Sequence, residues 1–170
     1  RDNDELVSVR LTPGNLEFIL ASKNGQAIKF NENDVRQMGR NATGVRGIKL
    51  RGDDEVVGME VALKNATLLT VTENGFGKRT DMDDYRLIRR GGSGVINIKI
   101  NERNGKVVGI KTVRDDDEVM MISKSGIVIR MPVVNVSSIG RNTQGVTLMK
   151  LREGDKVTTV ARTVKNDSGK

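Results

Sequence analysis

The apolar residues of this chain fall in short runs that alternate with polar residues, and no long segment keeps a helical period. Two pairs of runs rich in Val, Ile and Leu, 16–22 with 26–30 and 67–72 with 76–80, each flank an Asn-Gly dipeptide. Such a dipeptide supplies the positive φ angles of a two-residue hairpin turn. We therefore predict two β-hairpins here, and helix at most as a single turn near 83–88.

The hairpins belong to a repeat of about fifty residues. The segments 33–50, 83–100 and 134–151 align at offsets of 50 and 51, and each carries an Arg, a Gly-Val pair and a Lys in register. The aligned residues are Arg40, Arg90 and Arg141; Gly44, Gly94 and Gly145; and Lys49, Lys99 and Lys150. Upstream, the same offsets align the hairpin glycines Gly25, Gly75 and Gly126. A third hairpin is therefore predicted around Ser125-Gly126.

Each unit is predicted to hold four strands: the hairpin, then, after a loop of roughly 14 residues, a strand such as 95–100 and a strand such as 106–113. Four-stranded units that recur every 40 to 50 residues are typical of blades around an axis. We expect an all-β, propeller-like fold of about three four-stranded blades in an open arc. The expected division is a strand of a preceding blade at 1–12, blades at 13–63, 64–113 and 114–164, and a polar tail at 165–170.

The first residues favour this division. The opening NDELVSVRLT resembles DDEVVGMEVA, the last strand of a unit. We therefore expect the chain to start at the end of a unit whose other strands are absent, so that the sequence is a fragment.

Composition excludes most enzyme chemistry. With no histidine and no cysteine, the chain lacks the commonest general base, a thiolate nucleophile, disulfides and cysteine zinc sites. We expect no metal, no cofactor and no catalytic residue in these 170 residues. No apolar run approaches the roughly 20 residues that cross a bilayer, and the start has no signal-peptide h-region. A cytoplasmic protein with no membrane partner is expected.

The charges are segregated within the repeat. Basic residues outnumber acidic ones by 29 to 22, for a net charge of +7. They gather in the loops and at the ends of second hairpin strands, while acidic residues gather at turns. If equivalent positions of successive blades face the same way, the cations form a stripe along one rim that suits a long polyanion. The predicted contact residues are Lys29, Arg36, Arg40, Arg46, Lys49, Lys78, Arg79, Arg86, Arg89, Arg90, Lys99, Arg130, Arg141 and Lys150.

One loop joins two arginines to three glycines. It consists of Ile88, Arg89, Arg90, Gly91, Gly92, Ser93 and Gly94, and we call it the box-like loop. Glycine permits positive φ and close approach of a ligand, and the guanidinium fork suits phosphate oxygens. Such a loop holds a nucleic-acid backbone without reading sequence. A single copy of this pattern is in most proteins only a solvated turn, but three registered copies and the basic excess favour binding.

Aromatic residues are scarce, and this favours duplex DNA as the ligand. Binders of RNA and of single strands stack bases on aromatic side chains, and this chain has only four aromatic residues. Tyr85 is predicted to pack at the base of its loop, because no histidine or acidic metal cluster accompanies it as a nucleophile. The acidic run 115–118 is expected to be a solvated turn that repels misplaced nucleic acid.

Three segments, ENGFGKRT (73–80), RRGGSGVINIK (89–99) and SIGRNTQGV (138–146), together resemble the C-terminal domain of DNA gyrase A, over essentially the whole chain. The resemblance implies a β-pinwheel, in which neighbouring blades exchange strands and a basic rim binds and bends duplex DNA. It also implies a role in negative supercoiling by the holoenzyme, whose ATP, Mg²⁺ and catalytic residues belong to other parts. The implied partners are the rest of the gyrase A protein and, through it, the gyrase B protein.

The match to the family's signature box, Q-R-R-G-G-K-G, is incomplete. Ile88 replaces the Gln and Ser93 replaces the Lys. We interpret 88–94 as a degenerate later copy, with the box of the first blade outside this fragment, so simple binding stands beside wrapping as an expectation. Two other interpretations remain: the corresponding domain of topoisomerase IV, and a propeller that binds proteins. We expect the fragment to be monomeric and its parent to be associated with the nucleoid.

Overall fold

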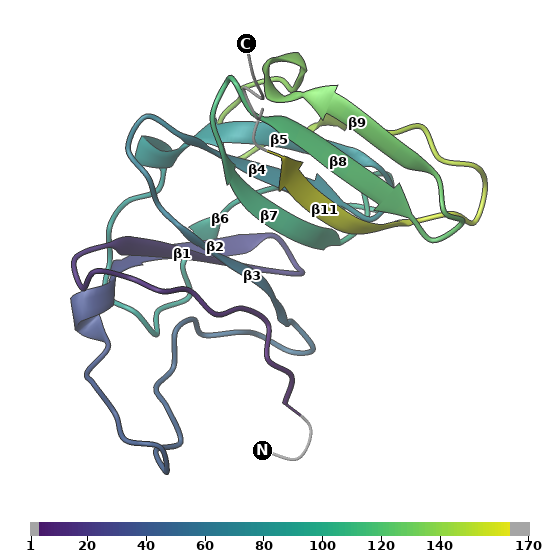
Figure 1. The fold of residues 1–170 in the computed structure, drawn as a ribbon. Helices are drawn as coiled ribbons and strands as arrows, with labels where there is room; N and C mark the ends of the chain where they lie inside the picture. Colours follow the sequence, from purple (N-terminus) through teal and green to yellow (C-terminus); the bar gives the residue numbers. More distant parts are fainter. Residues whose placement is uncertain (1–3, 164–170) are drawn as a thin grey trace.

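The structure is a computed structural model, and it describes residues 4–163, which form three antiparallel sheets in succession along the chain (Figure 1). The strand orders are β3-β1-β2-β6, β10-β5-β4-β7 and β11-β8-β9. The expected all-β fold of three successive blades is confirmed, although the third sheet has three strands where four were expected. The strands are β1 (Glu17–Ser22), β2 (Gln26–Asn31), β3 (Val56–Val61), β4 (Thr67–Thr72), β5 (Phe76–Asp81), β6 (Val95–Ile96), β7 (Val107–Val113), β8 (Glu118–Ser123), β9 (Val128–Pro132), β10 (Val146–Thr147) and β11 (Val157–Thr163).

The three predicted hairpins form, but their turns differ from the prediction. The N–H of Gly25 donates to the carbonyl of Ser22 at 3.1 Å, and Gly25 has a φ of +82°. Asn65 is the one non-glycine residue with positive φ in the described part of the chain, so Asn24 does not adopt it. The turn is therefore one residue longer than a two-residue loop, with a left-handed glycine that returns the chain to the sheet. Gly75 repeats this geometry with a φ of +80°.

Neighbouring units exchange strands. The two residues of β6 belong to the second repeat, yet they pair with β2 of the first sheet, with Val95 opposite Ala27. In the same way β10 of the third repeat pairs with β5 of the second sheet. The predicted strand at 95–100 stops after two residues because the N–H groups of Asn97 and Ile98 both turn onto the carbonyl of Gly25, at 2.8 and 3.2 Å. The chain then crosses over the hairpin tip instead of continuing the ladder.

Two expected strands do not form. The segment at Val45–Arg46, which corresponds to β6, has no preceding hairpin beside it among the described residues and is not a strand. Residues 4–12, expected to be the strand of a preceding blade, are also outside any strand, and the side chains of Leu6 and Leu11 are 84% and 99% exposed. Within the described part of the chain, the backbone of 4–12 has no neighbouring strand with which to pair. Residues 1–3 and the expected tail at 165–170 lie outside the described residues.

Each hairpin ends in a short 3-10 turn: η1 (Glu32–Asp34), η2 (Met82–Asp84) and η3 (Val133–Asn135). The closing strands β3, β7 and β11 pack beside one another, where Gly58 leaves room for Ile110 and Gly109 leaves room for Val160. The buried core divides into three clusters and is largely aliphatic, as the composition predicts; Phe18, Phe30 and Tyr85 are the buried aromatic exceptions.

Candidate nucleic-acid interface

The box-like loop is held by backbone bonds against the first unit. The N–H of Ile88 donates to the carbonyl of Lys29 at 2.9 Å, and the N–H of Lys49 donates to the carbonyl of Gly92 at 2.8 Å. Gly94 has a φ of +72°, and a Cβ there would lie 2.2 Å from the carbonyl oxygen of Ala27. Only glycine fits this contact. The loop is therefore the joint between two units, and we call it joint one.

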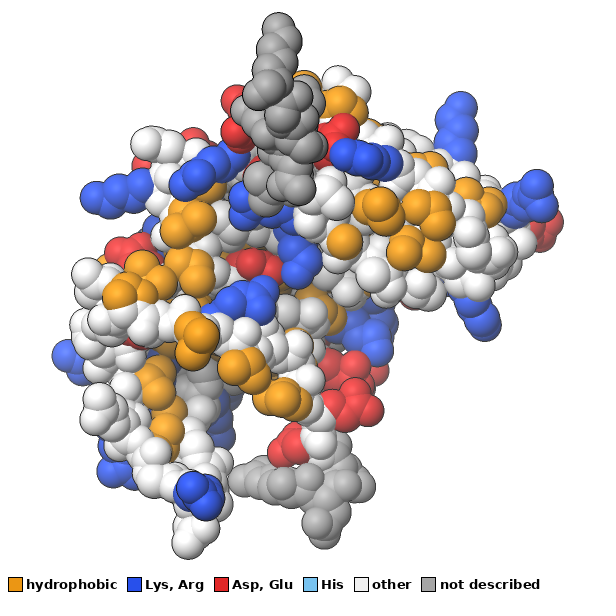
Figure 2. Space-filling view, in the orientation of Figure 1, with side chains coloured by type: hydrophobic (Ala, Val, Ile, Leu, Met, Phe, Trp, Pro, Cys, Tyr) orange, Lys and Arg blue, Asp and Glu red, His pale blue; other side chains and the backbone are white. Residues whose placement is uncertain are grey.

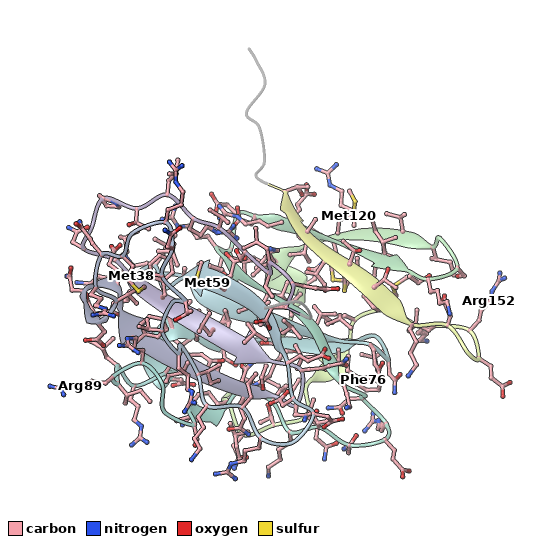
Figure 3. All side chains as sticks on the ribbon, turned by 90° about the horizontal axis from the view of Figure 1, so that it is seen from below. Met38, Met59, Phe76, Arg89, Met120 and Arg152 are labelled. Carbon is pink, nitrogen blue, oxygen red and sulfur yellow. The ribbon has the colours of Figure 1, made fainter. Side chains whose placement is uncertain are left out.

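The two arginines of the loop have different surroundings. Arg90 donates from Nε to the carbonyl of Asp34 at 2.8 Å and from Nη1 to the carbonyl of Arg46 at 3.1 Å. Its guanidinium group therefore holds the box-like loop to the first unit through hydrogen bonds to two carbonyls, an arrangement that we call the clasp. Arg89 is exposed and points away from the body of the molecule (Figure 3). Of the pair, Arg89 is the residue available to a ligand.

Joint two, between the second and third units, repeats the clasp. Arg141 donates from Nε to the carbonyl of Asp84 at 2.7 Å and from Nη1 to the carbonyl of Ile96 at 2.9 Å. These carbonyls occupy the same repeat positions as those that Arg90 binds. The guanidinium of Arg141 also lies over the ring of Tyr85, 6.0 Å from its centroid. Two of the three registered arginines, Arg90 and Arg141, therefore join blades, a role that the sequence pattern did not reveal.

Three predicted contact residues lie inside the protein, which corrects their assignment to the rim. Lys29 is 8% exposed and donates to the carbonyl of Met82 at 3.1 Å. Arg79 occupies the next equivalent position and donates to the carbonyl of Val136 at 2.9 Å. Both side chains satisfy carbonyls at the following unit's 3-10 turn, so they are not available to phosphate.

Lys78, the third of these residues, is completely buried at joint two. Its Nζ donates to the carbonyls of Gly140 and Arg141 at 2.7 and 2.8 Å. Burial, with a smaller contribution from the nearby Arg141 cation, lowers the pKa of Lys78 to about 8. Sequence could not separate this lysine from rim lysines, because the neighbour that buries it comes from another repeat.

Arg130 occupies, in the third unit, the repeat position of Lys29 and Arg79. It forms an ion pair with Glu118 of the adjacent strand, and its side chain is 56% exposed. No carbonyl of a following unit reaches it within residues 4–163. Its guanidinium is occupied by a carboxylate rather than left free for a polyanion.

The remaining predicted cations are exposed. They come from the loops and from the positions that follow β6 and β10, and Figure 2 shows Lys and Arg side chains projecting at the edges of the molecule. The exposed set is Arg36, Arg40, Arg46, Lys49, Arg86, Arg89, Lys99 and Lys150.

A hollow of about 240 Å³ brings the box-like loop together with cations of the first unit. Lys49 and Arg51 line it together with Ser93 and Gly94, and Asp54 also contributes to its wall. The carboxylate of Asp54 is engaged by the backbone N–H groups of Asn24 and Glu55. The hollow therefore presents two cations and a glycine backbone at joint one.

Sequence reasoning missed Arg51 and its equivalent Arg152. Both are exposed, and Arg152 projects outward in Figure 3. The signal that could have found them is the spacing of two residues from Lys49 and Lys150, which places both cations on one side of an extended segment. The second unit has Asn101 at this position, which weakens the pattern.

Tyr85 packs at the base of its loop, as predicted. It is 1% exposed, and its hydroxyl donates to Oδ1 of Asn97 at 2.6 Å. Asn97 in turn donates from Nδ2 to Thr70 at 3.0 Å. Burial raises the pKa of Tyr85, which disfavours the phenolate that a nucleophile requires. This polar network was not foreseen, because Asn97 was predicted only as a strand residue.

The acidic turn is partly buried, unlike the solvated turn that was expected. Asp117 is 3% exposed, accepts the N–H of Arg114 at 2.7 Å and pairs with Arg162 at 2.9 Å. In residues 4–163 no group of three Asp or Glu residues has the arrangement of a metal site. In the same part of the chain, no helix has the length and apolarity of a membrane span.

Comparison with known proteins places this geometry in a family. The family model described as the DNA gyrase C-terminal domain, a β-propeller, matches residues 16–62, 66–114 and 117–163. The DNA gyrase A protein of Halalkalibacterium halodurans is 64% identical over 95% of this chain and 19% of the relative. The gyrase A protein of Klebsiella oxytoca is 48% identical over 95% of this chain and 18% of the relative. The chain thus spans about a fifth of these curated relatives.

Solved structures agree with the family match. A DNA gyrase A C-terminal domain superposes with a TM-score of 0.83 at 33% identity, over 88% of this chain and 51% of that one. The C-terminal domain of DNA topoisomerase IV superposes with a TM-score of 0.88, over 93% of this chain and 50% of that one. At 24% identity, this similarity shows only that the two chains share a fold. With three registered repeats, exchanged strands and the matched segments, the chain belongs to the DNA gyrase C-terminal domain family.

Proposed function

We propose that the chain binds duplex DNA without sequence specificity along its exposed cations and bends it, as the C-terminal module of a gyrase A protein. The observation that carries the proposal is the hollow at joint one, which Lys49 and Arg51 line together with Ser93 and Gly94 of the box-like loop, the loop from which Arg89 projects. A guanidinium or ammonium group beside a glycine backbone suits phosphate oxygens. Because joint two repeats the geometry of joint one, the equivalent cation Lys99 would extend the line of phosphate contacts to the second unit.

The scarcity of aromatic surface supports a duplex over a single strand. Phe18, Phe30 and Tyr85 are buried, and Phe76 is covered by Arg103, whose guanidinium lies 4.9 Å from the ring centroid. Residues 4–163 therefore offer no open aromatic platform on which bases could stack. Contacts to a duplex backbone need cations instead.

The role of the whole protein goes further. We infer that the parent is part of an ATP-dependent type IIA topoisomerase whose catalytic residues and Mg²⁺ belong to other domains. DNA bent around this module would then favour negative supercoiling by the holoenzyme. The remainder of the gyrase A protein and the gyrase B protein are the inferred partners, and the inferred location is the cytoplasm, at the nucleoid. The relatives that carry the gyrase A name support this inference.

A salt titration tests DNA binding. If six to eight cations contact phosphates, the logarithm of affinity falls with the logarithm of salt concentration at a slope of about −5 to −7. The change Arg89→Ala is expected to weaken binding and reduce that slope by about 0.9. Arg114→Ala is the matched control, since Arg114 is exposed on the acidic turn. A slope near zero, or equal effects of the two changes, would contradict the proposal and favour a protein-binding propeller.

Bending and wrapping require a separate measurement. Nicked plasmid sealed by ligase in the presence of the chain records any handed wrap as a change of linking number. Bending a 20 to 30 base-pair site by 40 to 90° costs on the order of 1 to 6 kcal/mol, which several phosphate contacts can offset at low salt. A handed shift supports gyrase-like wrapping. Binding with no shift supports the weaker bending that we expect of a topoisomerase IV type of domain, whose fold also superposes on this one.

A further inference from the structure

The sequence contains three Asn-Gly dipeptides, Asn24-Gly25, Asn74-Gly75 and Asn104-Gly105. An asparagine before glycine can lose its side-chain amide without an enzyme, because a residue without a Cβ leaves its backbone nitrogen open to the preceding side chain. The reaction requires the asparagine Cγ to reach that nitrogen, so the carboxamide must be free to turn. The three dipeptides are chemically alike, and their surroundings therefore decide which of them reacts.

Asn104 is fixed at every polar atom of its side chain. Its Nδ2 donates to the carbonyls of Lys99 and Gln144 at 2.7 and 3.0 Å, and its Oδ1 accepts the N–H of Asn101 at 2.9 Å. The residue is 1% exposed. Turning this carboxamide toward the nitrogen of Gly105 breaks three hydrogen bonds in the interior, where unpaired polar groups are costly. Asn104 is therefore protected.

Asn74 lies at the tip of the β4–β5 hairpin and is also held by hydrogen bonds. Its Nδ2 donates to the carbonyls of Glu102 and Arg103 at 3.0 and 3.1 Å. Its Oδ1 accepts a hydrogen bond from the ammonium group of Lys156 at 2.6 Å. These partners belong to the loops that precede β7 and β11. The carboxamide of Asn74 must leave all three partners before it can reach the nitrogen of Gly75.

Asn24 occupies the same place at the tip of the β1–β2 hairpin, but its carboxamide is not tied. The N–H of Gly25 donates to the carbonyl of Ser22 at 3.1 Å, and the second hairpin repeats this bond at 3.0 Å, so the two turns match. The backbone N–H of Asn24 donates to Asp54 at 2.8 Å, whereas its carboxamide forms no hydrogen bond with residues 4–163. The side chain is half-buried and lines the hollow at joint one.

We propose that Asn24 is a site of spontaneous deamidation and that Asn74 and Asn104 are protected from it by the fold. The backbone nitrogen of Gly25 bonds to Cγ of Asn24 while the Cγ–Nδ2 bond breaks, and Nδ2 leaves as ammonia with the proton of that backbone nitrogen. The product is a five-membered succinimide. Water opens this ring at one of its two carbonyls, which leaves an aspartate or an isoaspartate at position 24. Either product carries a carboxylate at neutral pH.

The new carboxylate changes the charge of the hollow at joint one. Lys49 and Arg51 line this hollow, and Asp54 supplies one carboxylate to its wall. Deamidation adds a second negative charge, so the two cations attract phosphate less strongly. This consequence rests on the proposed function, because it requires the hollow to bind DNA. Since the ammonia is lost to solvent, the change accumulates with the age of the molecule and weakens DNA contact at joint one.

Peptide mapping of the whole chain tests the site without DNA. The chain is aged at mildly alkaline pH, in buffer and in guanidinium chloride, and its three Asn-Gly peptides are followed by mass spectrometry. In buffer, Asn24 is expected to convert about 10-fold faster than Asn74 or Asn104, because these must break additional hydrogen bonds. In denaturant the three rates should agree within about 3-fold, since the native contacts are lost. Equal rates in buffer, or a spread in denaturant as wide as in buffer, would overturn the proposal.

Duplex binding tests the consequence. Asn24→Asp introduces the carboxylate, and Asn65→Asp is the matched control, an equal change of charge at an exposed residue that shares a hollow with Arg114. Asn24→Asp is expected to weaken binding about 2- to 5-fold and to reduce the salt slope by about 0.9, and Asn65→Asp is expected to do neither. If the native chain binds DNA and both variants bind equally well, the consequence is overturned while the proposed function stands. If the native chain does not bind DNA, the proposed function and the consequence fail together, and the peptide map still decides the modification site.

Discussion

The ammonium nitrogen of Lys78 lies 2.7 Å from the carbonyl oxygen of Gly140, so a side chain of the second unit spans its joint with the third. Ile28 occupies the equivalent position at joint one. The two joints therefore share their backbone contacts and differ in this buried group. The lysine adds a charge whose burial makes joint two sensitive to pH.

The first prediction concerns that charge. The pKa of Lys78 is about 8 in the folded chain, below its ordinary value of 10.5. Between these values the unfolded chain binds the proton more strongly, so the free energy of unfolding rises with pH, by up to about 1.4 kcal/mol per pH unit. Denaturant unfolding at pH 7, 8, 9 and 10 should show the rise in the native chain, and Lys78→Met should lack it.

The unfolding measurements stop near pH 10 because the ionisation of Tyr85 lowers the free energy of unfolding above that pH. The pKa of Tyr85 is raised by burial, so the stability it contributes is complete below its unfolded value and is lost as pH rises toward its folded value. Parallel pH profiles for Lys78→Met and the native chain would contradict the buried-charge interpretation.

The second prediction concerns acid stability of the third hairpin. Asp155 accepts hydrogen bonds from the hydroxyl and N–H of Ser125, at 2.6 and 3.0 Å, and these bonds lower its pKa to about 2 from 3.8. Its contribution to stability is present above pH 3.8 and is lost as pH falls toward 2. Melting temperatures at pH 5 and pH 2.5 should therefore differ more for the native chain than for Asp155→Asn. Asp116→Asn is the control, because Asp116 is exposed and accepts no hydrogen bond from residues 4–163. If Asp116→Asn reduces the difference in melting temperature as much as Asp155→Asn does, the cause is the loss of one negative charge rather than the loss of these hydrogen bonds.

The third prediction separates turn strain from joint packing. Gly75 and Gly126 have φ angles of +80° and +86°, but a Cβ at Gly75 would lie 2.1 Å from the carbonyl oxygen of Met149, while one at Gly126 meets nothing within 4 Å. Gly126→Ala should cost about 1 to 2 kcal/mol in unfolding free energy, the strain of a positive φ. Gly75→Ala should cost about 1 to 3 kcal/mol more because its neighbour must move. Equal losses would show that joint two contributes no steric constraint.

The fourth prediction assigns different roles to adjacent arginines. Arg90→Ala removes hydrogen bonds to two carbonyls and should lower the unfolding free energy by about 1 to 3 kcal/mol. Arg89→Ala, at an exposed position, should stay within about 0.5 kcal/mol of the native chain. Arg40→Ala is the internal control for the clasp, since this equivalent of Arg90 is exposed. Denaturant titration of dilute samples measures all three; a destabilised Arg89→Ala with a native-like Arg90→Ala would reverse the assignment.

Much of the fold could be predicted from the sequence because the same local pattern of residues occurs in each repeat. The hairpins follow from apolar runs around glycines, and the repeat register follows from the Arg, Gly-Val and Lys positions. The lengths of β6 and β10 could not be predicted, since a carbonyl of another unit, such as that of Gly25, draws the chain out of the ladder. The sequence of residues 4–12 has the pattern of a strand, but a strand also needs a neighbouring strand with which its backbone can pair.

The candidate site was predicted less completely. Lys29, Lys78 and Arg79 share their repeat pattern with exposed cations, and only contacts across the joints reveal that they are buried. Arg90 and Arg89 are adjacent in sequence, and their different roles depend on the carbonyls of Asp34 and Arg46. Charge patterns predict a basic rim, but which cations reach solvent is decided by tertiary packing.

The exchanged strands have a mechanical consequence. Because the last strand of the first two sheets is supplied by the following unit, twisting one blade against its neighbour strains hydrogen bonds inside a sheet rather than a loose surface contact. Adjacent blades then respond to load together, as coupled elements. If the chain binds duplex DNA as we propose, such an arc would act as a stiff template: the duplex would take up the curvature of the protein, and the elastic energy would be stored in the DNA.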